Sequence, residues 1–276
     1  LHTLFRCMKI FCKFFFLLFT PLLLAQSTVQ LDTLLVQGIK ARSKKEYATS
    51  LELLTKVRTV AEENNWYKQQ FLAINNIGAN YYSMLDYGEA LDNYLEAYTI
   101  ALKHLDENEE MIVLNNIAIL YSKEGDLNKA EEYFSKAYVL AKEHKQNVKV
   151  GLYAVNLGIV ANQQNKLDVA ATYLAQAQEM LKDEPSIYLL AEIALAENYY
   201  KRGELEKAKS LAETVLPQLD PIALSEERIS ILVLLSNIAK DKGETAEAIE
   251  FAQTALKAAV NPEGRINAYQ QLADVY

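Results

Sequence analysis

Hydrophobic and polar positions follow the spacing of amphipathic helices over residues 31–276. Apolar residues recur three and four positions apart in successive stretches, and short polar segments separate these stretches. Residues spaced in this way share one face of an α-helix, where they form an apolar stripe that can be buried. The pattern therefore predicts pairs of helices joined by short turns. The scarcity of Gly and Pro, 9 and 5 residues, also favours helices.

The helix pairs repeat along the chain. The segments 72–81, 113–121 and 154–161 coincide when the chain is shifted by one fixed interval, and the segments 87–90, 127–130 and 167–170 follow them in the same register. Such a fixed period indicates a stacked repeat architecture. Small residues mark the first helix of each unit: Gly38, Gly78, Ala118, Gly158, Ala196, Ser236 and Ala273. The second helix has a small residue and, four positions later, a residue that is bulky in the first four units: Ser50 and Leu54, Ala90 and Tyr94, Ala130 and Phe134, Ala170 and Leu174, Ala208 and Ala212, Ala248 and Ala252.

These residue types have a steric meaning, because two helices cross closely where a small residue meets a bulky neighbour. The turn within several units also has a defined chemistry. Gly125-Asp126, Gly203-Glu204 and Gly243-Glu244 occur in register. We expect the glycine to end the first helix in a left-handed conformation and the acidic residue to favour the start of the second.

The series of small and aromatic residues resembles the tetratricopeptide repeat family. The resemblance implies an all-α fold, a right-handed superhelical solenoid of antiparallel helix pairs (an α-α superhelix). Six full repeats and the first helix of a seventh would occupy residues 31–276, and each repeat is about six residues longer than the family's basic 34. The agreement is weaker over residues 182–220. The sequence ends within the seventh unit, and we expect it to be truncated there, with an improvised cap as the alternative.

In the resembled family the first helix of each repeat lines a concave groove that binds protein segments. The resemblance implies that the outward positions of these helices are binding residues. Asn76, Asn116 and Asn156 recur beside them, and an asparagine can bracket a peptide backbone with its donors and its acceptor. The alternative is that these asparagines tie neighbouring helices together. The groove candidates are Asn75, Asn76, Ala79, Tyr82, Asn115, Asn116, Ile119, Asn156, Asn162, Glu197 and Tyr200.

The N-terminal segment resembles a bacterial secretory signal peptide. A short basic region from Met8 to Lys13 precedes an apolar stretch over 14–24, and Ala25 follows it. The apolar stretch is shorter than the ~20 residues that span a bilayer as a helix. We therefore expect residues 1–25 to be a signal peptide that starts at Met8 and is cleaved after Ala25. An uncleaved membrane anchor is the alternative.

Charge and composition exclude several classes of function. The formal charge of −8 becomes about −11 without residues 1–25, which contain three basic side chains and no acidic one, so binding to nucleic acid is disfavoured. Both cysteines, Cys7 and Cys12, precede the repeats, which excludes thiol chemistry there. We find no constellation of nucleophile, base or phosphate loop, and we expect no enzyme, no cofactor and no metal site. His104 and His144 hold equivalent positions in adjacent repeats, but two histidines alone do not make a metal site.

The sequence thus predicts an exported scaffold, periplasmic or associated with the outer side of a membrane, that binds a protein or peptide. The alternative is the extracytoplasmic input domain of a truncated signalling protein, a histidine kinase or a transcriptional regulator. We expect contact with a membrane only through an uncleaved leader or a C-terminal region beyond this sequence.

Overall fold

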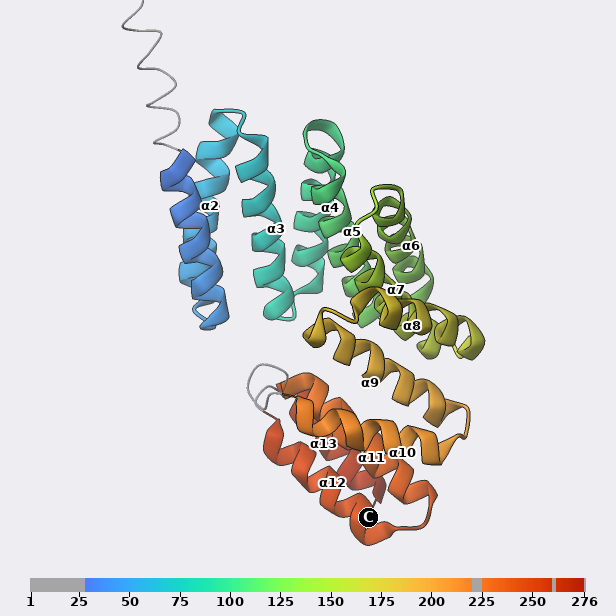
Figure 1. The fold of residues 1–276 in the computed structure, drawn as a ribbon. Coiled ribbons are helices and arrows are strands. Elements are labelled where there is room, and N and C mark those ends of the chain that lie inside the picture. The colour runs from blue at the N-terminus through green and yellow to red at the C-terminus, as the bar shows by residue number, and fades with distance from the viewer. Residues whose placement is uncertain (1–27, 220–224, 260–261, 276) are drawn as a thin grey trace, which may run out of the picture. The chain divides into compact units, whose positions relative to one another are not determined.

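The structure, a computed structural model, describes residues 28–219, 225–259 and 262–275 (Figure 1). The predicted signal peptide lies outside these residues. The described part contains helices and no strand, as predicted. A first helix covers 28–43. It is followed by α2 (Tyr47–Glu63), α3 (Tyr67–Ser83), α4 (Tyr87–His104), α5 (Glu107–Lys123), α6 (Leu127–Glu143), α7 (Asn147–Gln163), α8 (Leu167–Leu181), α9 (Pro185–Lys201), α10 (Leu205–Val215), the 3-10 turn η1 (Leu216–Gln218), α11 (Ser225–Asp241), α12 (Thr245–Ala258) and α13 (Pro262–Val275).

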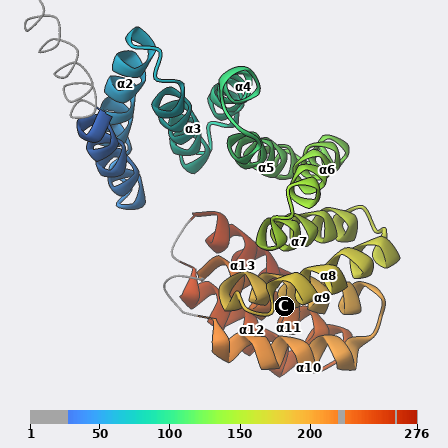
Figure 2. The ribbon, with the colours of Figure 1, turned by 45° about the horizontal axis from the view of Figure 1, so that its top comes forward.

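The chain divides into two compact units, residues 1–120 and 121–276, and the boundary falls within α5. In each unit consecutive helices run antiparallel and pack side by side (Figures 1 and 2). The sequence predicts one solenoid over 31–276, so this division is a structural finding that the periodicity does not reveal. The number of repeats stays a prediction. None of the described helices is both long enough and apolar enough to cross a membrane.

The predicted contacts between small and bulky residues are present. A Cβ atom on Gly78 of α3 would lie 2.8 Å from the Tyr94 ring of α4. A Cβ atom on Gly158 of α7 would lie 2.7 Å from the Leu174 side chain of α8. The helices of a pair can approach this closely only because the first helix lacks a side chain at the crossing point. The same arrangement occurs at Gly38, which faces Leu54.

The turns within the pairs also match the sequence prediction. Gly125, Gly203 and Gly243 have φ angles of 82°, 76° and 79°. The carboxylate of Asp126 accepts a hydrogen bond from the backbone N–H of Lys129 at 3.2 Å and so caps α6. The acidic residues after the other two glycines make no such cap, since the side chains of Glu204 and Glu244 accept no hydrogen bond from a backbone N–H of the helix that follows.

Each unit has its own buried apolar core. In unit 1, Trp66 packs against a buried cluster that includes Leu54, Val57 and Ile77. In unit 2, a buried cluster joins α9, α10 and α11 through residues such as Ala196, Ala212 and Leu235. The described residues of the segment over 182–220, where the repeat pattern weakens, therefore contribute to a buried core. Prolines stand near helix ends there, with Pro185 in the first turn of α9 and Pro217 in η1.

Candidate functional site

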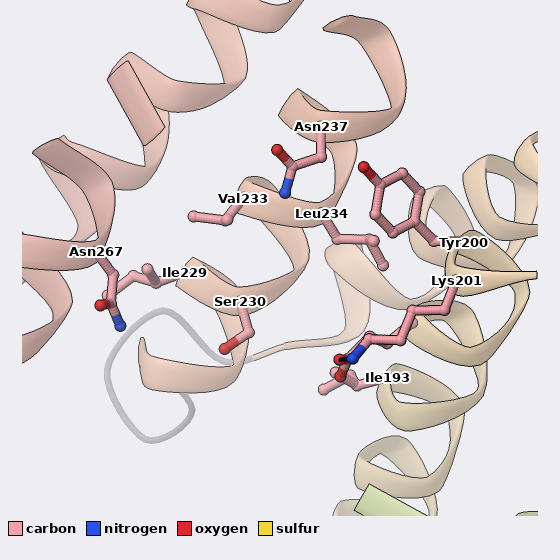
Figure 3. A pocket seen from close by; sticks show the side chains of 10 residues that line it. Ile193, Tyr200, Lys201, Ile229, Ser230, Val233, Leu234, Asn237 and Asn267 are labelled. Atoms are coloured by element: carbon pink, nitrogen blue, oxygen red, sulfur yellow. Dashed lines mark ion pairs between the residues drawn. The ribbon is translucent and has the colours of Figure 1, made fainter. Parts of the chain in front are cut away.

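Three helices of unit 2 line a pocket. These helices are α9, α11 and α13, and the space between their side chains has a volume of about 350 Å3 (Figure 3). Ligand pockets in proteins have volumes of roughly 300 to 1,000 Å3, so the pocket is at the small end of the range. It is lined by Ile193, Glu197, Tyr200, Lys201, Ile229, Ser230, Val233, Leu234, Asn237 and Asn267.

The floor of this pocket is apolar. Ile229 and Leu234 of α11 are only 3% and 7% exposed, because their side chains also pack into the core clusters beneath the pocket. Val233 lies between them on the same helix and is half-buried, as is Ile193 on α9. The four-residue spacing of Ile229 and Val233 places their side chains on one face of α11, and Leu234 lines the pocket beside them. This floor can accept an apolar side chain of a ligand.

Uncharged polar groups stand beside the floor. Within the described part of the chain, neither the Asn237 amide on α11 nor the Asn267 amide on α13 has a hydrogen-bond partner. Ser230 differs from them, because its hydroxyl donates to the carbonyl of Glu226 one turn earlier at 3.0 Å. In Figure 3 the two asparagines lie on different helices, on either side of the Ile229 and Val233 side chains. They therefore leave amide donors and acceptors open to a ligand.

The α9 side of the pocket is charged but internally neutralised. The Lys201 ammonium lies 3.3 Å from the Glu197 carboxylate and also donates to the backbone carbonyl of Asn162 at 2.9 Å. The Tyr200 hydroxyl donates to Asp241 at 2.8 Å and so links α9 to the end of α11. Burial, and then the hydrogen bond to Asp241, raise the pKa of Tyr200 to about 12. The phenol is therefore neutral at physiological pH.

A buried network of amides fixes the position of α9. The Asn198 amide donates to Asn162 Oδ1 at 2.7 Å and to the carbonyl of Leu167 at 2.9 Å, while the Asn162 amide donates to the carbonyl of Ala194 at 2.8 Å. Buried polar groups that are satisfied in this way specify one arrangement of the helices. Asn162 has no exposed surface, so its selection as a groove residue is wrong: α9 crosses over it and engages it.

In unit 1, an asparagine pair joins neighbouring first helices. The Asn116 amide of α5 donates to Asn75 Oδ1 of α3 at 2.9 Å, and Asn75 is only 9% exposed. The Asn76 amide donates instead to the Leu72 carbonyl in its own helix at 2.8 Å. Of the two alternatives for the recurring asparagines, the tie between helices therefore describes Asn116. The Asn76 amide bonds within α3 and makes no tie to another helix, and a peptide contact at Asn76 stays a prediction.

The remaining candidates are half-buried and do not line the pocket. Tyr82 packs against Tyr87 with 5.7 Å between the ring centroids, and Asn115 and Asn156 have polar partners. Ala79 and Ile119 offer small apolar surfaces. Only two of the predicted groove residues, Glu197 and Tyr200, line the pocket.

Sequence reasoning missed the part of the pocket that α11 and α13 supply. Val233 and Asn237 hold the same positions relative to Ser236 that Ile193 and Glu197 hold relative to Ala196. The repeat register therefore contained the signal, but the selection of groove residues ended at α9.

Comparison with known families identifies tetratricopeptide repeats in the chain. One tetratricopeptide repeat model matches residues 109–183, and a second matches residues 229–259. No curated protein matches the sequence significantly.

Several solved structures have a similar fold. The apo form of RapI is 14% identical, with a TM-score of 0.68, and the match covers 88% of this chain and 84% of RapI. NprR in complex with its cognate peptide NprX is 14% identical, with a TM-score of 0.61, and the match covers 89% of this chain and 72% of NprR. BtubC from P. vanneervenii is 20% identical, with a TM-score of 0.59, covering 81% of this chain and 90% of BtubC. At these identities the likeness concerns the fold. Residues 109–183 and 229–259 are therefore tetratricopeptide repeats, set in an all-α fold of the helical-repeat solenoid type.

Proposed function

We propose that the protein is an exported interaction scaffold that holds a peptide or protein segment in the pocket of α9, α11 and α13. The observation that carries this proposal is the pair of open amides on Asn237 and Asn267 beside an apolar floor. An amide offers two donors and one acceptor, which suits the repeating N–H and C=O groups of an extended backbone. One apolar side chain of the segment would fill the floor.

The charges around the pocket favour an uncharged segment. Glu197 and Lys201 neutralise each other, and the Tyr200 hydroxyl is already bonded to Asp241. A charged ligand side chain would have to lose its hydration without gaining a free partner of opposite charge, which is unfavourable. Affinity would therefore depend on apolar burial and backbone hydrogen bonds.

The similar structures support a peptide as the ligand. NprR has been solved with the NprX peptide, and the Rap conjugation gene regulator of plasmid pLS20 has been solved with the Phr* peptide. These ligands belong to those proteins, but they show that a similar arrangement of helices can hold a peptide.

A selection from a random peptide library tests the proposal. We expect the purified protein to enrich sequences with a bulky apolar residue and no adjacent charge. Asn237→Ala and Asn267→Ala should each weaken binding of an enriched peptide roughly five- to thirteenfold, since a lost hydrogen bond costs about 1–1.5 kcal/mol. Val233→Asp should weaken it further, because it places a carboxylate on the apolar floor.

Asn147→Ala is the matched control, since Asn147 is an exposed asparagine of α7 that does not line the pocket. Its affinity should equal that of the unmodified protein. Equal affinities in all four variants would place the binding site elsewhere, and a library that enriches nothing would argue against a peptide ligand.

Export rests on the sequence alone. The basic region from Met8 and the apolar stretch over 14–24 support passage through the Sec pathway with cleavage after Ala25. Expression in a bacterium and mass spectrometry of the secreted fraction test this proposal. A mature N-terminus at Gln26 is expected, and an unprocessed protein in the cytoplasm would contradict it.

A sensory role is the second candidate, and the likeness to the quorum sensor NprR supports it. In that case ligand binding would shift a conformational equilibrium and be passed to an output domain. Sequencing the gene beyond the codon for Tyr276 distinguishes the two roles. A spanning helix followed by a kinase or DNA-binding domain is expected for the sensor, and further repeats followed by a stop codon for the scaffold.

A further inference from the structure

The turn between α3 and α4 carries two exposed apolar side chains. Met84 is 37% exposed and Leu85 is 57% exposed. Leu85 also has a φ angle of 64°, in the left-handed region. The equivalent turn residues are Lys45, Gly125, Asn165, Gly203 and Gly243, all polar or without a side chain.

This turn is unfavourable for the isolated protein on two counts. An L-residue with a bulky side chain is strained in the left-handed region, and an exposed Leu and Met gain nothing from burial. Tyr82 and Tyr87 flank the turn, with 5.7 Å between their ring centroids. This turn combines backbone strain with exposed apolar side chains. The combination indicates that these side chains contact something outside the chain.

The end of the first helix, 28–43, and the turn that joins it to α2 are basic. Lys40, Arg42, Lys44 and Lys45 follow one another closely in a chain whose net charge is −8. Among the described residues, none of these four side chains forms an ion pair. Glu46 is the only acidic residue within this turn. On the turn between α3 and α4, the Asp86 carboxylate accepts a hydrogen bond from the backbone N–H of Glu89.

The two turns lie at the same end of unit 1 (Figures 1 and 2). The guanidinium of Arg42 connects them, because it lies close to the phenol groups of Tyr47 on α2 and Tyr94 on α4, and burial there lowers its pKa. The cations and the exposed apolar pair therefore lie at one end of unit 1, and we call Lys40, Arg42, Lys44, Lys45, Met84 and Leu85 the turn patch.

We propose that the turn patch is a contact surface for an anionic lipid bilayer. Lys44 and Lys45 would bind headgroup phosphates, and Met84 and Leu85 would enter the boundary between headgroups and acyl chains. The contact is peripheral and independent of the peptide pocket in unit 2.

The form of the patch favours a bilayer over an acidic protein segment. Met84 and Leu85 occupy the tip of a two-helix turn, so their side chains project from the unit. A bilayer surface is deformable and takes up projecting apolar groups of any orientation, while the long lysine side chains can reach phosphates at different depths. A protein segment would instead have to be complementary in shape to these projecting side chains.

Co-sedimentation of the full chain with vesicles tests this proposal. We expect binding to vesicles of phosphatidylcholine and phosphatidylglycerol, mixed two to one, to exceed binding to pure phosphatidylcholine, and to fall at high salt. The double variant Lys44→Gln/Lys45→Gln should bind about 30-fold more weakly, taking ~1 kcal/mol per cation near an anionic surface. Leu85→Gly should also weaken binding, and it relieves backbone strain, so a folding defect is not expected.

The controls lie at the other end of α4 in the same unit. Leu102→Ser removes an apolar side chain that is 55% exposed, and Lys103→Gln removes an exposed cation. Both should bind as the unmodified protein does. Because every variant carries the same apolar stretch over 14–24, any contribution of that segment cancels in the comparison.

Equal binding by the patch variants and the controls would overturn the proposal. Failure to bind anionic vesicles, together with salt-sensitive retention on immobilised polyglutamate, would overturn it in favour of an acidic protein segment. Circular dichroism of each variant checks that the helices are intact.

Discussion

The side-chain amide of Asn116 on α5 donates a 2.9 Å hydrogen bond to Asn75 Oδ1 on α3, which joins the first helices of two neighbouring pairs. The two residues are 41 positions apart in the sequence, about one repeat. Because Asn75 is almost fully buried, loss of its partner would leave a polar group without compensation.

Asn116→Ala should therefore lower the free energy of unfolding by about 1–2 kcal/mol. Urea denaturation followed by circular dichroism measures the change. A double-mutant cycle with Asn75→Ala isolates the pair, and a coupling energy of about 0.5–1.5 kcal/mol is expected. Strictly additive effects would show that the hydrogen bond contributes nothing in solution.

Gly78→Ala should destabilise unit 1 by about 1–3 kcal/mol, since the new methyl group would lie 2.8 Å from the Tyr94 ring. Gly88→Ala is the control, because the nearest atom to its new methyl group is Asp86 Oδ1 at 4.0 Å. At that site alanine should be neutral or stabilising by up to about 1 kcal/mol. Equal effects at the two positions would contradict the close crossing of α3 and α4.

Leu85→Gly should raise the free energy of unfolding by about 1 kcal/mol, because glycine adopts the left-handed conformation without strain. Gly125→Ala should lower it by a similar amount, since the φ angle there is 82°. Chemical denaturation of both variants provides the comparison. A destabilised Leu85→Gly variant would show that the leucine side chain makes contacts that outweigh the strain.

Buried tyrosines should make the protein sensitive to alkaline pH. Burial raises the pKa of Tyr153 to about 12, against an ordinary value near 10. The neutral phenol is favoured in the folded state, so its contribution is complete below pH 10 and is lost as the pH rises from 10 to 12. We expect the free energy of unfolding to fall over this interval, and Tyr153→Phe to reduce the slope. An unchanged slope in this variant would exclude Tyr153 as a source.

The sequence predicts the helices and their crossing points well, because both depend on local chemistry. The fit between Gly78 and Tyr94 and the left-handed turn at Gly125 follow from residue size and backbone freedom at fixed spacing. These properties repeat along the chain, so each occurrence strengthens the prediction of the others.

The candidate site is less predictable, because the side of a helix on which a residue lies does not say how closely the next helix crosses it. Asn162 and Tyr200 stand at equivalent positions, four residues after Gly158 and Ala196. Asn162 is buried beneath α9, whereas Tyr200 stays half-exposed at the pocket. The spacing of small residues shortens from 40 to 38 between Gly158 and Ala196, but the sequence pattern alone does not predict that this change buries Asn162.

The location of Trp66 has a practical consequence for spectroscopy. It is the sole tryptophan of the chain, and it packs against the core of unit 1. Its fluorescence emission therefore reports the unfolding of unit 1, whereas far-ultraviolet circular dichroism averages the helices of both units. Unfolding curves that coincide in the two signals would report a single cooperative molecule, and curves that separate would resolve the order in which the units melt.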